Sequence, residues 1–125
     1  MKRMIFSLLC LILSVNFMGV LSYSQIRFDK KVNISSIYKS EVSNFKENHF
    51  QPINNEVFLE VVKSAKRTYA KFIPHKEVVL YDKNGKTLKL LFSEDNRVFY
   101  SIEGYFKLSR RNALLVSQLF DDLDS

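Results

Sequence analysis

The sequence predicts a small α+β domain, in which a three-stranded antiparallel meander carries two or three helices on one face. Three observations lead to this fold class. Asn84-Gly85 lies between two short apolar runs, which is the strongest local signal for a β-hairpin. Apolar residues recur at helical spacing before this hairpin and again near the C-terminus. The 125 residues include only three glycines and two prolines, a composition typical of a chain with one packed core.

The first 24 residues have the features of a secretory signal peptide. Lys2 and Arg3 precede an uncharged apolar stretch, Met4–Val15. Ser22 and Ser24 then supply the small residues that a signal peptidase reads. We therefore expect cleavage after Ser24 and an extracytoplasmic location, either secreted or periplasmic.

An uncleaved leader is the alternative, because residues 4–21 form an 18-residue stretch at the lower limit for a single-pass membrane anchor. Cys10 is the only cysteine, so a processed domain over residues 25–125 has no disulfide and no thiol-based site. Without Lys2 and Arg3 its net charge falls from +6 to +4. This modest excess slightly favours an anionic partner.

The segment that follows the leader has the weakest pattern. Three apolar residues are compatible with a short N-terminal strand: Ile26, Phe28 and Val32. Helical spacing of later apolar residues predicts an amphipathic helix over Ser35–Glu47. Pro52 disfavours helix in the residue before it, so we expect residues 48–52 to form a connector.

A stronger helical pattern covers Asn54–Phe72. Asn54 or Asn55 can cap this helix, and Pro74 marks the end of the helical region. Its predicted apolar stripe comprises Val57, Phe58, Val61, Val62, Ala65, Tyr69 and Phe72.

The hairpin is predicted to pair Glu77–Asp82 with Thr87–Phe92 through a two-residue type I′ turn at Asn84-Gly85. This turn length sets the register and places Tyr81 opposite Leu88.

The third strand of the meander is predicted over Arg97–Ile102, where Glu103-Gly104 ends it. A closing helix follows over Ser109–Leu123, with Ser109 as its cap and Leu108 packed against Ala113.

The charges of this closing helix oppose its dipole. Arg110 and Arg111 lie in the first turn, next to the positive end, and three acidic residues lie at or just past the last turn: Asp121, Asp122 and Asp124. The arrangement points to an anion or acidic-partner site at the start of the helix. The alternatives are that these arginines form salt bridges to Glu94, to Glu103 or to another helix, or that they are simply solvated.

A second basic group comprises Lys63, Arg67 and Lys71, spaced four residues apart, with Lys66 alongside. This stripe could contact phosphate or an acidic protein, although a solvated helix face explains it equally well. No nucleic-acid partner is expected, because Tyr69 and Phe72 belong to the apolar stripe rather than to a stacking surface.

No catalytic or metal motif is present, and no metal or cofactor is expected: the chain has no HExxH spacing and no GxSxG elbow. His49 and His75 are the only histidines, both in predicted connectors. The leading expectation is an exported non-catalytic module that binds an unknown protein or anionic partner, such as an inhibitor or accessory protein. The alternatives are a small extracytoplasmic hydrolase that uses His49 or His75, and a membrane-tethered structural or envelope protein.

Overall fold

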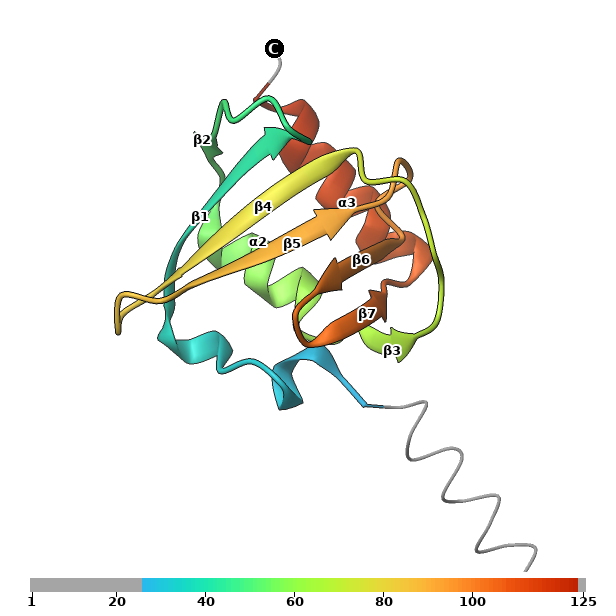
Figure 1. Ribbon diagram of the computed structural model, residues 1–125, viewed down its shortest axis with the longest axis horizontal. Helices are drawn as coiled ribbons and strands as arrows, with labels where there is room; N and C mark the ends of the chain where they lie inside the picture. The colour runs from blue at the N-terminus through green and yellow to red at the C-terminus, as the bar shows by residue number, and fades with distance from the viewer. Residues whose placement is uncertain (1–25, 124–125) are drawn as a thin grey trace, which may run out of the picture.

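The computed structural model describes residues 26–123, in which a seven-stranded antiparallel sheet carries two α-helices on one face (Figure 1). The predicted signal peptide and its cleavage site after Ser24 lie outside the described residues. The α+β class and the one-sided placement of the helices are confirmed. The predicted three-stranded meander is wrong, because the sheet has seven strands in the order β2-β1-β4-β5-β6-β7-β3.

The elements follow one another along the chain as η1 (Phe28–Lys30), η2 (Ile34–Ser36), β1 (Ile37–Asn44), β2 (Gln51–Pro52), α2 (Asn55–Val62), β3 (Lys66–Thr68), β4 (Lys76–Asp82), β5 (Thr87–Phe92), β6 (Val98–Ser101), β7 (Gly104–Lys107) and α3 (Arg110–Asp121). Strands β4 to β7 form a continuous meander, while β1 and β3 join it from opposite sides.

The helix predicted over Ser35–Glu47 is wrong, since this stretch contains η2 and β1. A register irregularity after Ile37 disturbs the strict alternation of a strand. The buried residues of its first half are therefore Ile37 and Ser40, three positions apart, which resembles helical spacing. Ser40 is polar but satisfied, because its hydroxyl donates to Asn55 Oδ1 at the start of α2.

The helix predicted over Asn54–Phe72 is confirmed only in its first part. Asn54 caps it by accepting a hydrogen bond from the Val57 N–H (3.1 Å), but α2 ends at Val62. The chain then turns into β3, which pairs with β7. The predicted apolar stripe is therefore interrupted, and Tyr69 is 76% exposed.

The N-terminal strand expected around Ile26 and Phe28 is replaced by η1 and a single β-bridge between Arg27 and Lys66. The Phe28 N–H donates to the Ala65 carbonyl, and the Arg67 N–H donates to the Ile26 carbonyl, both at 2.8 Å. This segment covers the outer edge of β3, which would otherwise present unpaired backbone groups.

The hairpin of β4 and β5 is confirmed, but its register differs by one residue. Tyr81 lies opposite Thr87 instead of Leu88, because the loop has three residues. Only Gly85 in this loop has a positive φ (83°), as in a type I turn followed by a left-handed residue. The Asp82 carboxylate accepts a hydrogen bond from the Asn84 N–H at 2.7 Å, which favours this turn over type I′.

The predicted third strand is β6, and the chain returns at once as β7, which the sequence pattern did not reveal. The closing helix is confirmed: Ser109 caps α3 by accepting a hydrogen bond from the Asn112 N–H at 3.1 Å. Leu108 and Ala113, the residues predicted to pack together at the start of this helix, both belong to the buried core.

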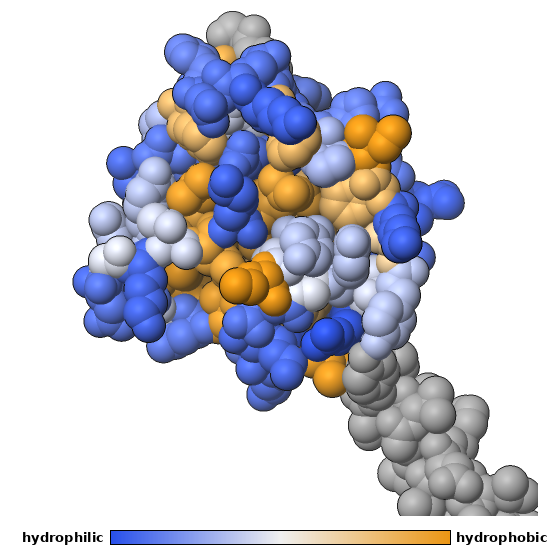
Figure 2. Space-filling view, in the orientation of Figure 1, coloured by the Kyte–Doolittle hydropathy of each residue, from blue (hydrophilic) through white to orange (hydrophobic). Residues whose placement is uncertain are grey.

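The core lies between the sheet and the helices and is rich in phenylalanine. The Phe99 ring lies 5.1 Å from Phe28, 5.1 Å from Phe92 and 5.6 Å from Phe106, measured between ring centroids. No helix of the described chain covers the opposite face of the sheet, which faces the viewer in Figures 1 and 2. Figure 2 shows hydrophobic atoms near the middle of this open face, between hydrophilic side chains.

Candidate functional site

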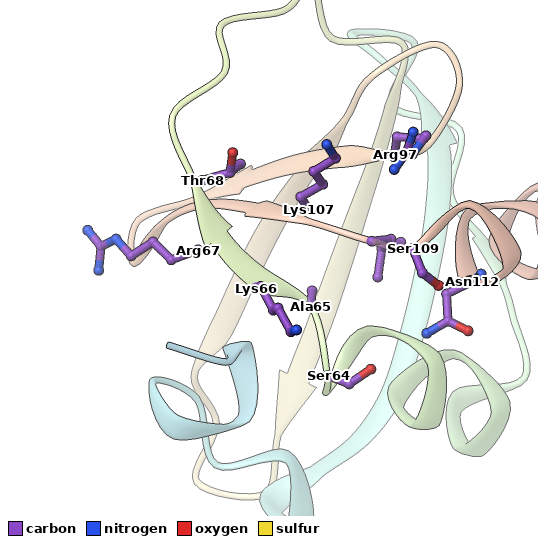
Figure 3. Close-up of a pocket in the computed structure, with 10 residues that line it drawn as sticks. Ser64, Ala65, Lys66, Arg67, Thr68, Arg97, Lys107, Ser109 and Asn112 are labelled. Carbon is purple, nitrogen blue, oxygen red and sulfur yellow. Dashed lines mark hydrogen bonds between the residues drawn. The ribbon is translucent and has the colours of Figure 1, made fainter. Parts of the chain in front are cut away.

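A hollow of about 410 Å³ lies where the turn after α2 meets the junction between β7 and α3. It is lined by Ser64, Lys66, Arg97, Lys107, Ser109 and Asn112, together with neighbouring residues (Figure 3). We call this space the basic hollow. Asn112 also joins the two helices, because its side-chain amide donates to the Val61 carbonyl at 3.3 Å.

Two lysines of the basic hollow oppose each other across neighbouring strands. Lys66 of β3 is the direct register partner of Lys107 of β7, and both are exposed. Neither forms a salt bridge within residues 26–123. Directly opposed like charges destabilise a sheet. In Figure 3 the two side chains extend in different directions, which limits this repulsion, and a bound anion would offset what remains.

Arg97 contributes a third cation from the turn between β5 and β6. Its Nε is shielded from solvent and has no hydrogen-bond partner in the described part of the chain. Both backbone groups of Arg97, the N–H and the carbonyl, form hydrogen bonds that fix its position. The Arg97 N–H donates to Asp95 Oδ1 at 3.0 Å, and the Arg97 carbonyl accepts from the Leu108 N–H at 2.7 Å. The hydrogen bond from the Arg97 N–H, and next that from the Ser93 hydroxyl, lower the pKa of Asp95.

The first turn of α3 adds a positive potential beside the hollow. Ser109 caps the Asn112 N–H, and the Ala113 N–H bonds the Ser109 carbonyl at 2.9 Å. These bonds do not use the N–H groups of Arg110 and Arg111, which point out of the positive end of the helix.

The side chains of Arg110 and Arg111 are exposed and do not line the hollow. Within the described residues neither forms a salt bridge, so the alternative pairing with Glu94 or Glu103 is not present. Glu94 instead approaches His75, with Nε2 and Oε2 at 4.0 Å.

The second predicted basic group is dispersed, because α2 ends before it. Lys63 pairs with Glu60 at 2.8 Å, and Lys71 is exposed in the connection after β3. Arg67 is one of the residues that line the basic hollow, but its guanidinium extends away from the other lining side chains in Figure 3. Its guanidinium lies over Gly104, where an added Cβ would be 3.1 Å from Nη2.

The two histidines lie in different hollows, both exposed. His49 lines a small space near Ser43 and Glu47, and His75 lines another beside Glu94. The Ser43 hydroxyl already donates to the Asn44 carbonyl and accepts from the His49 N–H. Residues 26–123 contain no cluster of three or more potential metal ligands of the His, Cys, Asp and Glu types.

Of the residues that the sequence singled out, Arg67 and the neighbouring Lys66 line the hollow and Arg110 and Arg111 do not, while Arg97 and Lys107 were not singled out. Neither missed residue lies in a local pattern, because the pairing of β3 with β7 brings them to the site. None of the helices within residues 26–123 has the length and apolar character needed to cross a membrane. No protein-family model, curated protein or solved structure matches this chain.

Proposed function

We propose that this protein is an exported, non-catalytic module that binds an anionic macromolecular partner at the basic hollow. Export is supported by the leader pattern of the first 24 residues. The observation that carries the binding proposal is the opposed pair Lys66 and Lys107 at the rim of a hollow beside a helix start.

Two independent features of the site favour a negative ligand. The lysine pair and Arg97 bring three cations to one hollow, and the shielded Arg97 Nε lacks a hydrogen-bond acceptor among the described residues. The start of α3 adds backbone donors and the positive end of the dipole. Charge-assisted hydrogen bonds to phosphate, sulfate or carboxylate oxygens would satisfy the lysine ammonium groups and the free backbone donors.

The proposed site can be tested by NMR titration of the purified protein with inorganic phosphate and sulfate. We expect concentration-dependent shifts in the amide signals of residues 64–68 and of Arg110 and Arg111. The double reversal Lys66→Glu/Lys107→Glu should remove these shifts.

A matched control reverses two exposed lysines at the hairpin tip, Lys83→Glu/Lys86→Glu, far from β3 in Figure 1. The control has the same net charge as the site variant, so it should keep the shifts. Equal loss in both variants would show that the anion responds to net charge and would overturn the proposed site.

A further inference from the structure

The basic hollow continues into an aromatic surface on the open face of the sheet. Residues that are directly opposite each other in neighbouring strands share one face. Val98, Lys107 and Lys66 form one such row across β6, β7 and β3. The adjacent row is Tyr100, Tyr105 and Thr68. Phe99 and Phe106 alternate with these residues and point into the core, so both rows face away from the helices.

The tyrosines of the second row form a contiguous aromatic platform. The ring centroids of Tyr100 and Tyr105 are 4.8 Å apart, and Phe72 supports Tyr105 edge-on at 6.1 Å. Tyr100 is 40% exposed. Neither phenol hydroxyl forms a hydrogen bond within residues 26–123, so each is available to a ligand. Tyrosine suits a ligand with an apolar face and polar edges, since it offers a ring and a hydroxyl together.

The two rows lie about 7 Å apart along the strands, since side chains on one face repeat every second residue. A sugar ring that carries an acidic substituent spans this distance. Its C–H face would lie on a tyrosine while its carboxylate or sulfate reached Lys107 and Lys66.

The charge distribution on the rest of the open face favours a polysaccharide over a nucleic acid. Proteins that bind single-stranded nucleic acid have a positively charged groove that runs along the whole bound length of the strand. Among the strand lysines that face this side within residues 26–123, Lys66 and Lys107 next to the basic hollow are the ones without a salt bridge. Farther along the sheet, the lysines are neutralised in pairs with acidic residues. Lys39 pairs with Glu41, and Lys89 pairs with the buried Glu77, each at 2.8 Å.

From these observations we infer that the partner is an acidic polysaccharide, whose sugar rings lie on Tyr100 and Tyr105 and whose acidic groups bind Lys66, Lys107 and Arg97. This inference rests on the proposed function, because it names the ligand of the same site. The basic hollow accepts the acidic substituent, and the tyrosines provide selectivity for a chain of rings over an isolated anion.

Isothermal titration calorimetry of the purified protein can test the inference. Heparin fragments present sulfate and carboxylate groups, oligogalacturonate presents carboxylates alone, and dextran is neutral. We expect binding to one or both acidic sugars and none to dextran. Preference between the two acidic sugars identifies the anionic group.

Three variants separate the contribution of charge from that of the rings. Lys66→Glu/Lys107→Glu should weaken binding about tenfold or more at low salt. Tyr100→Leu keeps an apolar side chain and should weaken it about fivefold, while phosphate binding stays unchanged. Tyr38→Leu is the control, because Tyr38 is 56% exposed on β1, remote from both rows, and should bind as wild type. Circular dichroism confirms that each variant folds.

Several results would overturn the inference. If phosphate shifts the amides of the hollow but neither acidic sugar binds, the polysaccharide is wrong and the proposed function stands. If phosphate and both sugars fail, both proposals fall. Wild-type affinity of Tyr100→Leu for the sugars would reject the tyrosine platform. Tighter binding of oligothymidylate or polyglutamate than of either sugar, with the same dependence on Lys66 and Lys107, would assign a different class of partner.

Discussion

Replacement of Lys107 by glutamate should stabilise the protein while it removes anion binding. Lys107 and Lys66 are direct register partners at the edge of the sheet, so the substitution converts an opposed pair of like charges into a pair of opposite charges. Lys107 also lies two residues before the Ser109 cap, where a negative charge interacts favourably with the start of α3.

The expected gain follows from the exposure of both side chains. A cross-strand charge pair is worth about 0.2–1 kcal/mol, and the substitution removes a repulsion and adds an attraction. The helix dipole adds a few tenths of a kcal/mol, and solvent screening reduces both contributions. We therefore expect the free energy of unfolding to rise by about 0.5–1.5 kcal/mol at low salt. For a domain of this size, each kcal/mol raises the Tm by about 4–8 °C.

Urea denaturation at low salt and in 1 M NaCl provides the assay. At 1 M salt the Debye length is about 3 Å, so most of the gain should disappear. Lys107→Gln should raise the free energy of unfolding by only part of this amount at low salt, because it removes the repulsion without adding an attraction. In Lys66→Glu/Lys107→Glu two like charges oppose each other again, so the second substitution should lose the pairing energy. A destabilised Lys107→Glu variant, or a gain independent of salt, would refute the electrostatic reasoning.

Three further outcomes test the fold. Phe99→Leu should lower the free energy of unfolding by about 1–3 kcal/mol, because three ring contacts and buried volume are lost; a change below about 0.5 kcal/mol in urea denaturation would contradict the central position of this ring. Gly85→Ala should cost about 1–2 kcal/mol in thermal unfolding through its positive φ alone, since the added Cβ meets open space, whereas Gly85→Asn should cost less. Asp95→Asn should lower stability at neutral pH, because the hydrogen bonds from the Arg97 N–H and the Ser93 hydroxyl lower the pKa of Asp95 in the folded state. This contribution is present above the unfolded pKa of about 3.9 and is lost as the pH falls through the folded value, so the two proteins should converge in acid; a gap that persists there would contradict this cause.

Signals within a few residues were sufficient to locate the starts of both helices. Ser109 caps α3 as predicted, and Asn54, one of the two predicted alternatives, caps α2, because a cap depends on a side chain and an N–H group three residues away. The Asn84-Gly85 pair likewise marked the hairpin. The predicted register of this hairpin was wrong by one residue, because the hydrogen bond from the Asn84 N–H to the Asp82 carboxylate favours a three-residue loop.

The ends of elements and the added strands were decided by pairing between distant segments. The helical pattern continued past Val62, but the chain leaves the helix there and pairs as β3 with β7 and with the N-terminal segment. Strand β1 was hidden because two of its buried residues, Ser40 and Ser43, are polar and its apolar Tyr38 is 56% exposed, so the apolar spacing does not follow the alternation of the strand. Such pairing energies depend on residues tens of positions away, which local periodicity does not report.

The candidate site divides in the same way. The reversed charges at the start of the closing helix were evident from Arg110 and Arg111, because the helix dipole is a local property. The opposition of Lys66 to Lys107 and the arrival of Arg97 beside them required the folded sheet. Composition and local spacing therefore determined the fold class, the caps and the hairpin. The tertiary structure alone created the basic hollow, because its walls come from segments that meet only when β3 pairs with β7.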